Sequence, residues 1–247
     1  MSEPEPQQEA GAPTAAPPEK EKKEIFAAIS SSVAEAADAS AAADAELIIV
    51  GAKNSGKSTL VQNFLQKEEP PKPSTPLEFR FARRANGNST IVANVWELGG
   101  GVAGSTAAEL LQQVLLPDQM AKSVVVITLD FAEPEGALES LTGWFSAVRA
   151  RVEQMRTELA ISAAGSAIAG AARQATEELW AEHADTGVEA VEAVNPVGVP
   201  VVVVAHKWDV FEQTYGETEY RKLVSRALRF LAHQAGASLI CTKGVSQ

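Results

Sequence analysis

The segment Gly51-Ala-Lys-Asn-Ser-Gly-Lys-Ser58 matches the phosphate-binding loop pattern G-x-x-x-x-G-K-[ST] in full. The apolar run 47–50 in front of it predicts a buried strand, and apolar residues at helical spacing behind Thr59 predict a helix. The motif requires this order of strand, glycine-rich turn and helix, because it directs backbone N–H groups and a helix N-terminus at phosphate oxygens. The segment therefore predicts an α/β domain that binds a nucleotide at one edge of its sheet.

The residues of this loop are expected to have separate roles. Gly51 and Gly56 permit backbone angles that place N–H groups around the phosphates. Lys57 is expected to reach the outer phosphates, and Ser58 is expected to ligate a magnesium ion. Four further residues are expected to line the phosphates, largely through their backbone: Lys53, Asn54, Ser55 and Thr59.

The overall composition excludes several classes of partner. A net charge of −11 and a pI near 4.9 argue against nucleic acid or an anionic membrane surface. No apolar run reaches transmembrane length, so we expect no direct membrane insertion. The single cysteine, Cys241, excludes an internal disulfide framework. Composition also predicts that residues 1–45 form a disordered acidic and Ala-rich tail, and that residues 46–247 form the folded domain.

Two neighbouring strands are predicted to form an antiparallel hairpin. Residues 77–81 alternate between apolar and polar side chains, and apolar residues return between Ile91 and Trp96. Asn86-Gly87 lies between them, and this dipeptide is the strongest short signal for a tight hairpin. We therefore expect one antiparallel strand within an otherwise parallel sheet.

The remaining apolar segments predict the rest of the domain. Continuous apolar runs are typical of parallel strands that are covered on both faces, and they occur at 47–50, 124–129 and 200–205. Residues 238–241 are predicted to form a final short strand. Helices are predicted at 106–116, 137–183 and 217–234, the last with Tyr220, Leu223, Val224, Ala227, Leu228 and Leu231 on one apolar face. The sum is a six-stranded, mostly parallel sheet with helices on both faces, which is the layout of a small-GTPase-like P-loop domain.

Residues 137–183 are long for one crossover, so we expect a helical insert of two helices with a break near Gly165 or Gly170. Its first half carries large apolar side chains at helical spacing. They are expected either to dock a partner or to pack on the domain's own sheet: Trp144, Phe145, Val148, Val152 and Met155.

Glu97-Leu-Gly-Gly100 stands where a small GTPase has Asp-x-x-Gly followed by Gln. Glu97 is expected to reach a magnesium-bound water, and Gly99 to contact the terminal phosphate. Gly100 lacks the side chain that orients the attacking water, so hydrolysis is expected to be slow or absent unless a partner supplies the missing group. Thr75 is a further candidate magnesium ligand, with a plain surface loop as the alternative.

The segment His206-Lys-Trp-Asp209 follows a predicted strand, where guanine-selective proteins carry Asn-Lys-x-Asp. Asp209 is expected to accept hydrogen bonds from the guanine edge, and the Lys207 stem to pack on the base. Thr242 and Lys243 stand where a last base-contacting loop is expected. The expected cofactor is GTP or GDP with Mg²⁺, and the alternatives are an empty pocket and an exposed cluster at the strand end.

Three stretches together resemble the light intermediate chains of cytoplasmic dynein, in the dynein-2 form of intraflagellar transport. They are Gly51–Ser58, Val95-Trp-Glu-Leu-Gly-Gly-Gly101, and Lys207–Phe211 with the later segments 227–233 and 236–239. The Trp-Glu-Leu-Gly-Gly-Gly run is more specific than the phosphate loop. The resemblance covers about 46–243, and the first 45 residues are expected to carry none of it.

The resemblance implies a non-catalytic motor subunit that docks on the tail of the dynein-2 heavy chain, stabilises it and supports retrograde intraflagellar transport and cilium assembly. It implies contact with other dynein-2 subunits and intraflagellar transport particles, in the cytoplasm, the cilium and the cytoskeleton. The alternative is a regulatory GTPase that slowly hydrolyses GTP, with nucleotide-dependent movement of residues 68–76 and 99–104. An ATP-using P-loop protein is disfavoured by the hairpin and by Lys207-x-Asp209.

Such a domain normally closes with a helix after its last strand, and this helix is missing after Lys243. We therefore expect either a truncated sequence or a partner that covers the last face of the sheet.

Overall fold

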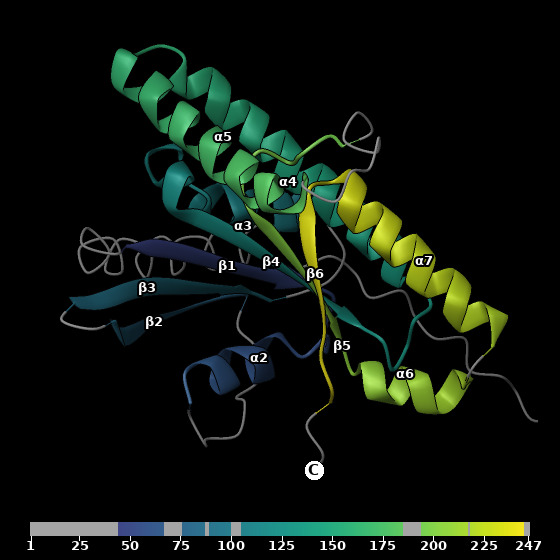
Figure 1. Ribbon diagram of the computed structural model, residues 1–247. Coiled ribbons are helices and arrows are strands. Elements are labelled where there is room, and N and C mark those ends of the chain that lie inside the picture. Colours follow the sequence, from purple (N-terminus) through teal and green to yellow (C-terminus); the bar gives the residue numbers. More distant parts are fainter. Residues whose placement is uncertain are drawn as a thin grey trace, which may run out of the picture.

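The computed structural model describes residues 44–66, 76–86, 89–99, 105–184, 194–216 and 218–244. These residues form a six-stranded sheet in the order β2-β3-β1-β4-β5-β6 (Figure 1). Neighbouring strands are parallel except β2 and β3, which form the predicted antiparallel hairpin. The strands are β1 Ala45–Gly51, β2 Leu77–Asn86, β3 Ser89–Leu98, β4 Ser123–Asp130, β5 Val201–His206 and β6 Ala237–Cys241. The predicted α/β fold class is confirmed.

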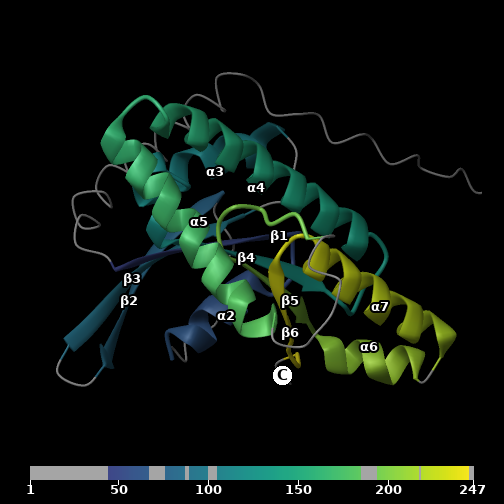
Figure 2. The same cartoon turned by 45° about the horizontal axis from the view of Figure 1, so that its top comes forward.

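The helices divide unequally between the two faces of the sheet. Helices α3, α4, α5 and α7 lie on one side, and α2 lies on the other (Figures 1 and 2). A short 3₁₀ helix, η1, precedes β4. The bounds are α2 Lys57–Phe64, α3 Ser105–Val114, η1 Pro117–Lys122, α4 Ala137–Leu159, α5 Ala163–Ala184, α6 Trp208–Tyr215 and α7 Glu219–Gln234. None of the helices within the described ranges is long and apolar enough to cross a membrane.

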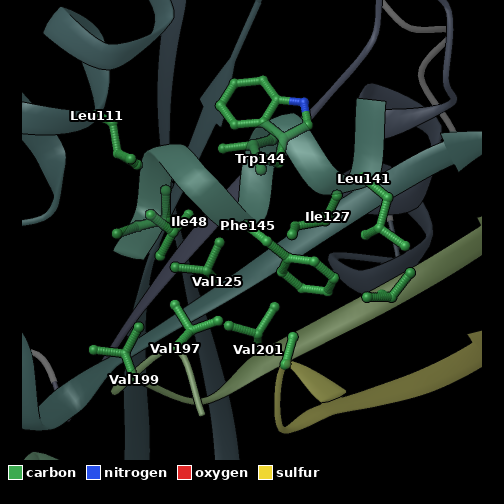
Figure 3. Close-up of a cluster of buried hydrophobic side chains, with 14 of the residues drawn as sticks. Ile48, Leu111, Val125, Ile127, Leu141, Trp144, Phe145, Val197, Val199 and Val201 are labelled. Carbon is green, nitrogen blue, oxygen red and sulfur yellow. The ribbon is translucent and has the colours of Figure 1, made fainter. Parts of the chain in front are cut away.

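The larger core cluster lies between the sheet and the helices α3, α4 and α7. Phe145 of α4 projects toward the strand residues Val125, Ile127 and Val201, whereas the Trp144 ring lies on the opposite side of α4 within the same core cluster (Figure 3). All five apolar side chains that were candidates for docking a partner are at most 5% exposed: Trp144, Phe145, Val148, Val152 and Met155. They are buried in the domain's own core, so the interpretation of this face as a docking surface is wrong.

The predicted insert of two helices is confirmed, and the break between them falls at residues 160–162, a few residues before Gly165. Both glycines lie inside α5. The Ser162 Oγ accepts a hydrogen bond from the Gly165 N–H at 3.0 Å, so Ser162 serves as an N-terminal cap. Gly165 is buried, and a Cβ there would overlap the Leu159 carbonyl group. This glycine therefore lets α5 start close to the end of α4.

The two glycines of α5 provide a matched test of this packing. We expect Gly165→Ala to lower the free energy of unfolding by about 1–3 kcal/mol, because the new methyl group overpacks the turn. Gly170 has no atom within 4 Å of its added Cβ, so Gly170→Ala is expected to raise this free energy by about 0.5–1 kcal/mol. Urea unfolding measures both, and effects of the same sign would contradict the packing explanation.

Helix α6, directly after β5, was not predicted from the sequence. Its only fully buried side chain is Phe211, which is 0% exposed. The Phe211 ring lies 4.9 Å from the Trp208 ring, 5.3 Å from Phe131 and 5.1 Å from Tyr215, measured between centroids. The helix is thus held by aromatic contacts, one of which comes from the residue just after β4.

Helix α7 begins at Glu219, two residues later than predicted, and the Thr218 side chain caps it by accepting from the Arg221 N–H. Its predicted apolar face is correct only in part. Val224 and Leu228 are buried, whereas Tyr220 is 41% and Leu223 is 66% exposed. Some of the apolar side chains of α7 therefore point away from the core.

A buried polar group joins β1 to β3. Glu46 is only 3% exposed. Its carboxylate accepts hydrogen bonds from Asn94 Nδ2 at 2.6 Å and from Trp96 Nε1 at 3.0 Å. In the same ladder Glu46 is paired with Asn94, and Ile49 with Glu97. The hydrogen bonds of Glu46 are therefore made in the same β1–β3 register that places Glu97 beside the end of β1.

Candidate functional site

The predicted site residues gather at the carboxyl-terminal edge of the sheet, where ligands bind in open α/β folds. The phosphate loop follows β1, and Glu97 lies near the end of β3. The segment 206–209 spans the end of β5 and the start of α6, while Thr242 and Lys243 follow β6. Asp130, the last residue of β4, lies between these groups. Figure 1 shows these strand ends converging between α2 and α6.

Two predicted residues lie outside the residues that the structure describes. They are Thr75, the candidate magnesium ligand, and Gly100, which stands in the place of the catalytic Gln. Their roles stay predictions.

The phosphate loop is anchored to the neighbouring strand β4. Thr128 donates a hydrogen bond to the Val50 carbonyl at 3.1 Å, and its hydroxyl lies 2.7 Å from the Ser55 hydroxyl. Gly51 has φ +149°, and a Cβ there would overlap the Thr128 carbonyl oxygen. Thr128 was not assigned from the sequence, where its only signal is a hydroxyl within an apolar strand. Its contacts fix the path of the chain into the loop.

Lys57 lies folded over the loop that it follows. Its side chain is buried, and its Nζ donates to the carbonyls of Gly51 at 3.2 Å and Ala52 at 2.8 Å. Burial lowers the pKa of Lys57, and the nearby Glu97 carboxylate opposes this effect. An ammonium group has three N–H donors, so one donor remains for a phosphate oxygen. Lys53 and Asn54 are exposed at the loop tip, and Thr59 is half-buried at the start of α2.

Ser58 and Glu97 meet beside the loop. The Ser58 hydroxyl donates to Glu97 Oε1, whereas Glu97 Oε2 is buried and has no hydrogen-bond partner within the described part of the chain. Burial raises the pKa of Glu97, while the hydrogen bond from Ser58 lowers it. Burying a carboxylate oxygen without a hydrogen-bond partner costs free energy. Such an oxygen is a ligand that a hard cation such as Mg²⁺ prefers.

Ser58 and Glu97 therefore fit the predicted magnesium ion. The described residues hold no cluster of three or more His, Cys, Asp or Glu with metal-ligand spacing. Mg²⁺ commonly takes one or two protein ligands and completes its shell with phosphate and water. The pair thus suits a metal that arrives with a nucleotide.

His206 links the base side of the site to the phosphate loop. Its Nδ1 lies 2.8 Å from the Thr242 hydroxyl. A Cβ on Gly56, which has φ +84°, would overlap the His206 ring. Burial lowers the pKa of His206, and the charge of Lys207 lowers it further, so the imidazole is neutral at pH 7. The His that departs from the usual Asn therefore still contacts the phosphate loop.

The other base-side residues are tied together as well. Lys207 Nζ lies 2.6 Å from Asp130 Oδ2 and 3.4 Å from the Asn54 carbonyl of the phosphate loop. Asp209 Oδ1 accepts from the Gly244 N–H at 2.7 Å, and this bond holds the pKa of Asp209 below its usual value. Asp130 and Gly244 thus join the predicted set. Lys243 lies between Thr242, which contacts His206, and Gly244, which donates to Asp209.

Comparison with known proteins places this arrangement in a family. The model of the family "Dynein light intermediate chain (DLIC)" matches residues 20–164. The chain belongs to the dynein light intermediate chain family. The predicted resemblance is confirmed, but the expectation that the first 45 residues carry none of it is wrong, since the match begins at residue 20. Residues 20–43 of the match precede the described residues.

Relatives of this light intermediate chain come from the dynein-2 branch. The human "Cytoplasmic dynein 2 light intermediate chain 1" is 31% identical over 211 residues, which cover 83% of this chain and 56% of that protein. The Danio rerio protein of the same name is 33% identical over 216 residues, which cover 87% and 57%. The chain thus spans somewhat more than half the length of these curated relatives.

A solved light intermediate chain structure supports the fold. "Crystal Structure of the Dynein Light Intermediate Chain's Conserved Domain" matches with a TM-score of 0.60 at 19% identity, covering 82% of this chain and 69% of that one. At this identity the match establishes a shared fold.

Proposed function

We propose that this chain is a non-catalytic light intermediate chain subunit of the cytoplasmic dynein-2 motor. The observation that carries the proposal is the family match, together with curated relatives that are named as dynein-2 light intermediate chains. In this role the GTPase-like domain docks on the tail of the dynein-2 heavy chain and stabilises the motor.

The same proposal places the chain in retrograde intraflagellar transport and cilium assembly. Its partners are then the heavy chain, the other dynein-2 subunits and the intraflagellar transport particles. Its locations are the cytoplasm, the cilium or flagellum, and the microtubule cytoskeleton. The net charge of −11 supports a protein partner over nucleic acid.

Within this subunit, the nucleotide site holds GTP or GDP with Mg²⁺ as a structural ligand. The arrangement of Lys57, Ser58 and Glu97 supports this. A phosphate would accept a hydrogen bond from the remaining N–H of Lys57, and a cation would bind Glu97 Oε2, which has no hydrogen-bond partner among the described residues. Bound nucleotide would supply the phosphate oxygens that accept hydrogen bonds from the loop N–H groups and from Lys57. Asp209 and the Lys207 stem would hold the base.

A regulatory GTPase remains the second candidate, because the phosphate loop motif is complete. It requires hydrolysis, yet Gly100 has no side chain to orient water. Slow single-turnover hydrolysis of bound GTP in the isolated chain, accelerated by a partner, would favour this second candidate over a structural ligand.

The nucleotide content of the purified chain tests the site. We expect about one guanine nucleotide per chain in the wild type and about a tenfold lower content in Lys57→Ala, because the loop loses its direct phosphate charge contact. The matched control is Lys53→Ala in the same loop, whose exposed side chain is expected to leave the content unchanged. Ion-exchange chromatography of the nucleotides released on denaturation gives the measurement. Equal contents in both variants would contradict the assignment of Lys57.

Association with the heavy chain tests the subunit role separately. We expect the full chain, co-expressed with the tail of the dynein-2 heavy chain, to co-purify with it in a fixed ratio. Failure to co-purify would reject the proposed subunit role whatever nucleotide the chain carries.

A further inference from the structure

Helix α7 presents a second row of apolar side chains that faces away from the core. The inner face is formed by Val224, Leu228 and Ala232, each at most 7% exposed. The outer row consists of Tyr220, Leu223, Ala227 and Phe230, at successive spacings of three, four and three residues. It starts against α6, where the Tyr220 ring lies 5.0 Å from Tyr215 and 6.3 Å from Phe211 between centroids. Within it Leu223 is 66% exposed and Phe230 is 61% exposed. This spacing, close to 3.5 residues, is the repeat by which one helix packs along another.

Basic side chains follow the solvent side of this row. Lys222, Arg226 and Arg229 are exposed, and Arg226 stands three residues after Leu223 and four before Phe230. The helix carries four Arg or Lys residues and one Glu, in a chain whose net charge is −11. Neither Arg226 nor Arg229 forms an ion pair with another residue in the ranges that the structure describes. The face is thus positive and apolar on an acidic protein.

We propose that the outer row of α7 and its arginines form the docking face for an acidic amphipathic helix of the dynein-2 heavy-chain tail. The identity of the partner rests on the proposed function. Apolar side chains of the partner would pack on Leu223 and Phe230, as knobs do on an a/d row. Its carboxylates would pair with Arg226, which flanks the row, because a planar guanidinium group suits bidentate carboxylate contacts.

The geometry favours a helix over other partners. The row is a single helix wide, whereas a membrane surface is flat and is repelled by the acidic remainder of the chain. Figure 2 shows the beginning of α7 at the periphery of the molecule, beside α6.

The test uses two double variants of equal composition. Arg226→Glu with Phe230→Glu alters the α7 face, and Phe81→Glu with Arg83→Glu alters an exposed patch on β2. The control pair is similar, since Phe81 is 58% exposed and Arg83 lies over its ring at 5.4 Å. Each full-length variant is co-expressed with the heavy-chain tail, and the co-purified tail is quantified per chain. Melting temperature and bound nucleotide are measured alongside.

We expect the α7 variant to lose co-purified tail by at least about tenfold, as for the loss of an interface hot spot, and the β2 variant to retain it. High salt is expected to weaken the wild-type complex, because charge pairs contribute to it. Both variants are expected to keep the wild-type melting temperature and nucleotide content.

Three results would overturn the assignment. If the α7 variant retains the tail while the wild type also binds it, the docking face is wrong and the proposed function stands. If the wild type itself fails to bind the tail, the proposed function and the docking face fall together. If the wild type binds vesicles of phosphatidylcholine and phosphatidylserine and only the α7 variant loses this binding, the face serves a membrane.

Discussion

Phe211→Ala is expected to lower the free energy of unfolding by about 3–5 kcal/mol, because it leaves a cavity in a packed aromatic cluster. Phe211 is fully buried, and its ring contacts those of Phe131, Trp208 and Tyr215. The matched control is Phe230→Ala on the surface of α7, where 61% exposure predicts a change below about 0.5 kcal/mol. Urea unfolding of the two variants gives the comparison.

The cavity left by Phe211→Ala is also expected to weaken nucleotide binding. Helix α6 starts immediately after Lys207, so a loosened α6 frees the loop that carries Lys207 and Asp209. A domain is stable by only about 5–15 kcal/mol, and the loss is a large part of that. We therefore expect a lower nucleotide content in Phe211→Ala as well. Similar unfolding energies for Phe211→Ala and Phe230→Ala would show that α6 is not held by this cluster.

Gly51→Ala is expected to destabilise the chain by about 2–5 kcal/mol, from backbone strain and overpacking together. Gly51 has φ +149°, and an added Cβ would overlap the carbonyl oxygen of Thr128 and its hydroxyl. Thr128 belongs to β4, which is bonded on both sides within the sheet. Its backbone therefore cannot move to accommodate a methyl group. We also expect the variant to purify without nucleotide.

A second glycine separates strain from overlap. Gly136 also has positive φ, +78°, but an added Cβ there would meet no atom within 4 Å. Gly136→Ala is therefore expected to cost only the strain of the left-handed backbone, about 1–2 kcal/mol. Thermal or urea unfolding measures both variants. An equal cost at the two positions would mean that the contact with Thr128 does not constrain the loop.

The parts of the fold that were predicted correctly are those with local signals. The phosphate loop has fixed residue types at fixed positions, and the parallel strands have continuous apolar runs. The hairpin was marked by Asn86-Gly87, and the observed ladder runs out to the pair Asn86 and Ser89. Because parallel strands end at one edge, the grouping of the site residues also followed from the order of the elements.

The parts that were missed depend on contacts between distant residues. Helix α6 is only eight residues long and exists because Phe211 packs against Phe131 of another segment. The role of Thr128 depends on a strand pairing that brings it to Ser55, which is 73 residues away in sequence. The exact residues of the break after α4 had a local signal in Ser162, but the glycines nearby are stronger breakers in general. Here the packing of Gly165 decided the outcome.

The hydrogen bonds of Glu46 have a consequence at the other end of β3. A slip of one residue between β1 and β3 would turn every β3 side chain to the opposite face of the sheet, and Glu97 would then no longer face Ser58. Such a slip would also bury the Glu46 carboxylate without Asn94 and Trp96, at a high cost in free energy. Glu97, the candidate metal ligand, is therefore positioned with the help of Glu46, whose carboxylate lies about 10 Å away along the strands and does not contact the metal site. The position of Glu97 in the site thus depends on the β1–β3 register that the Glu46 hydrogen bonds stabilise.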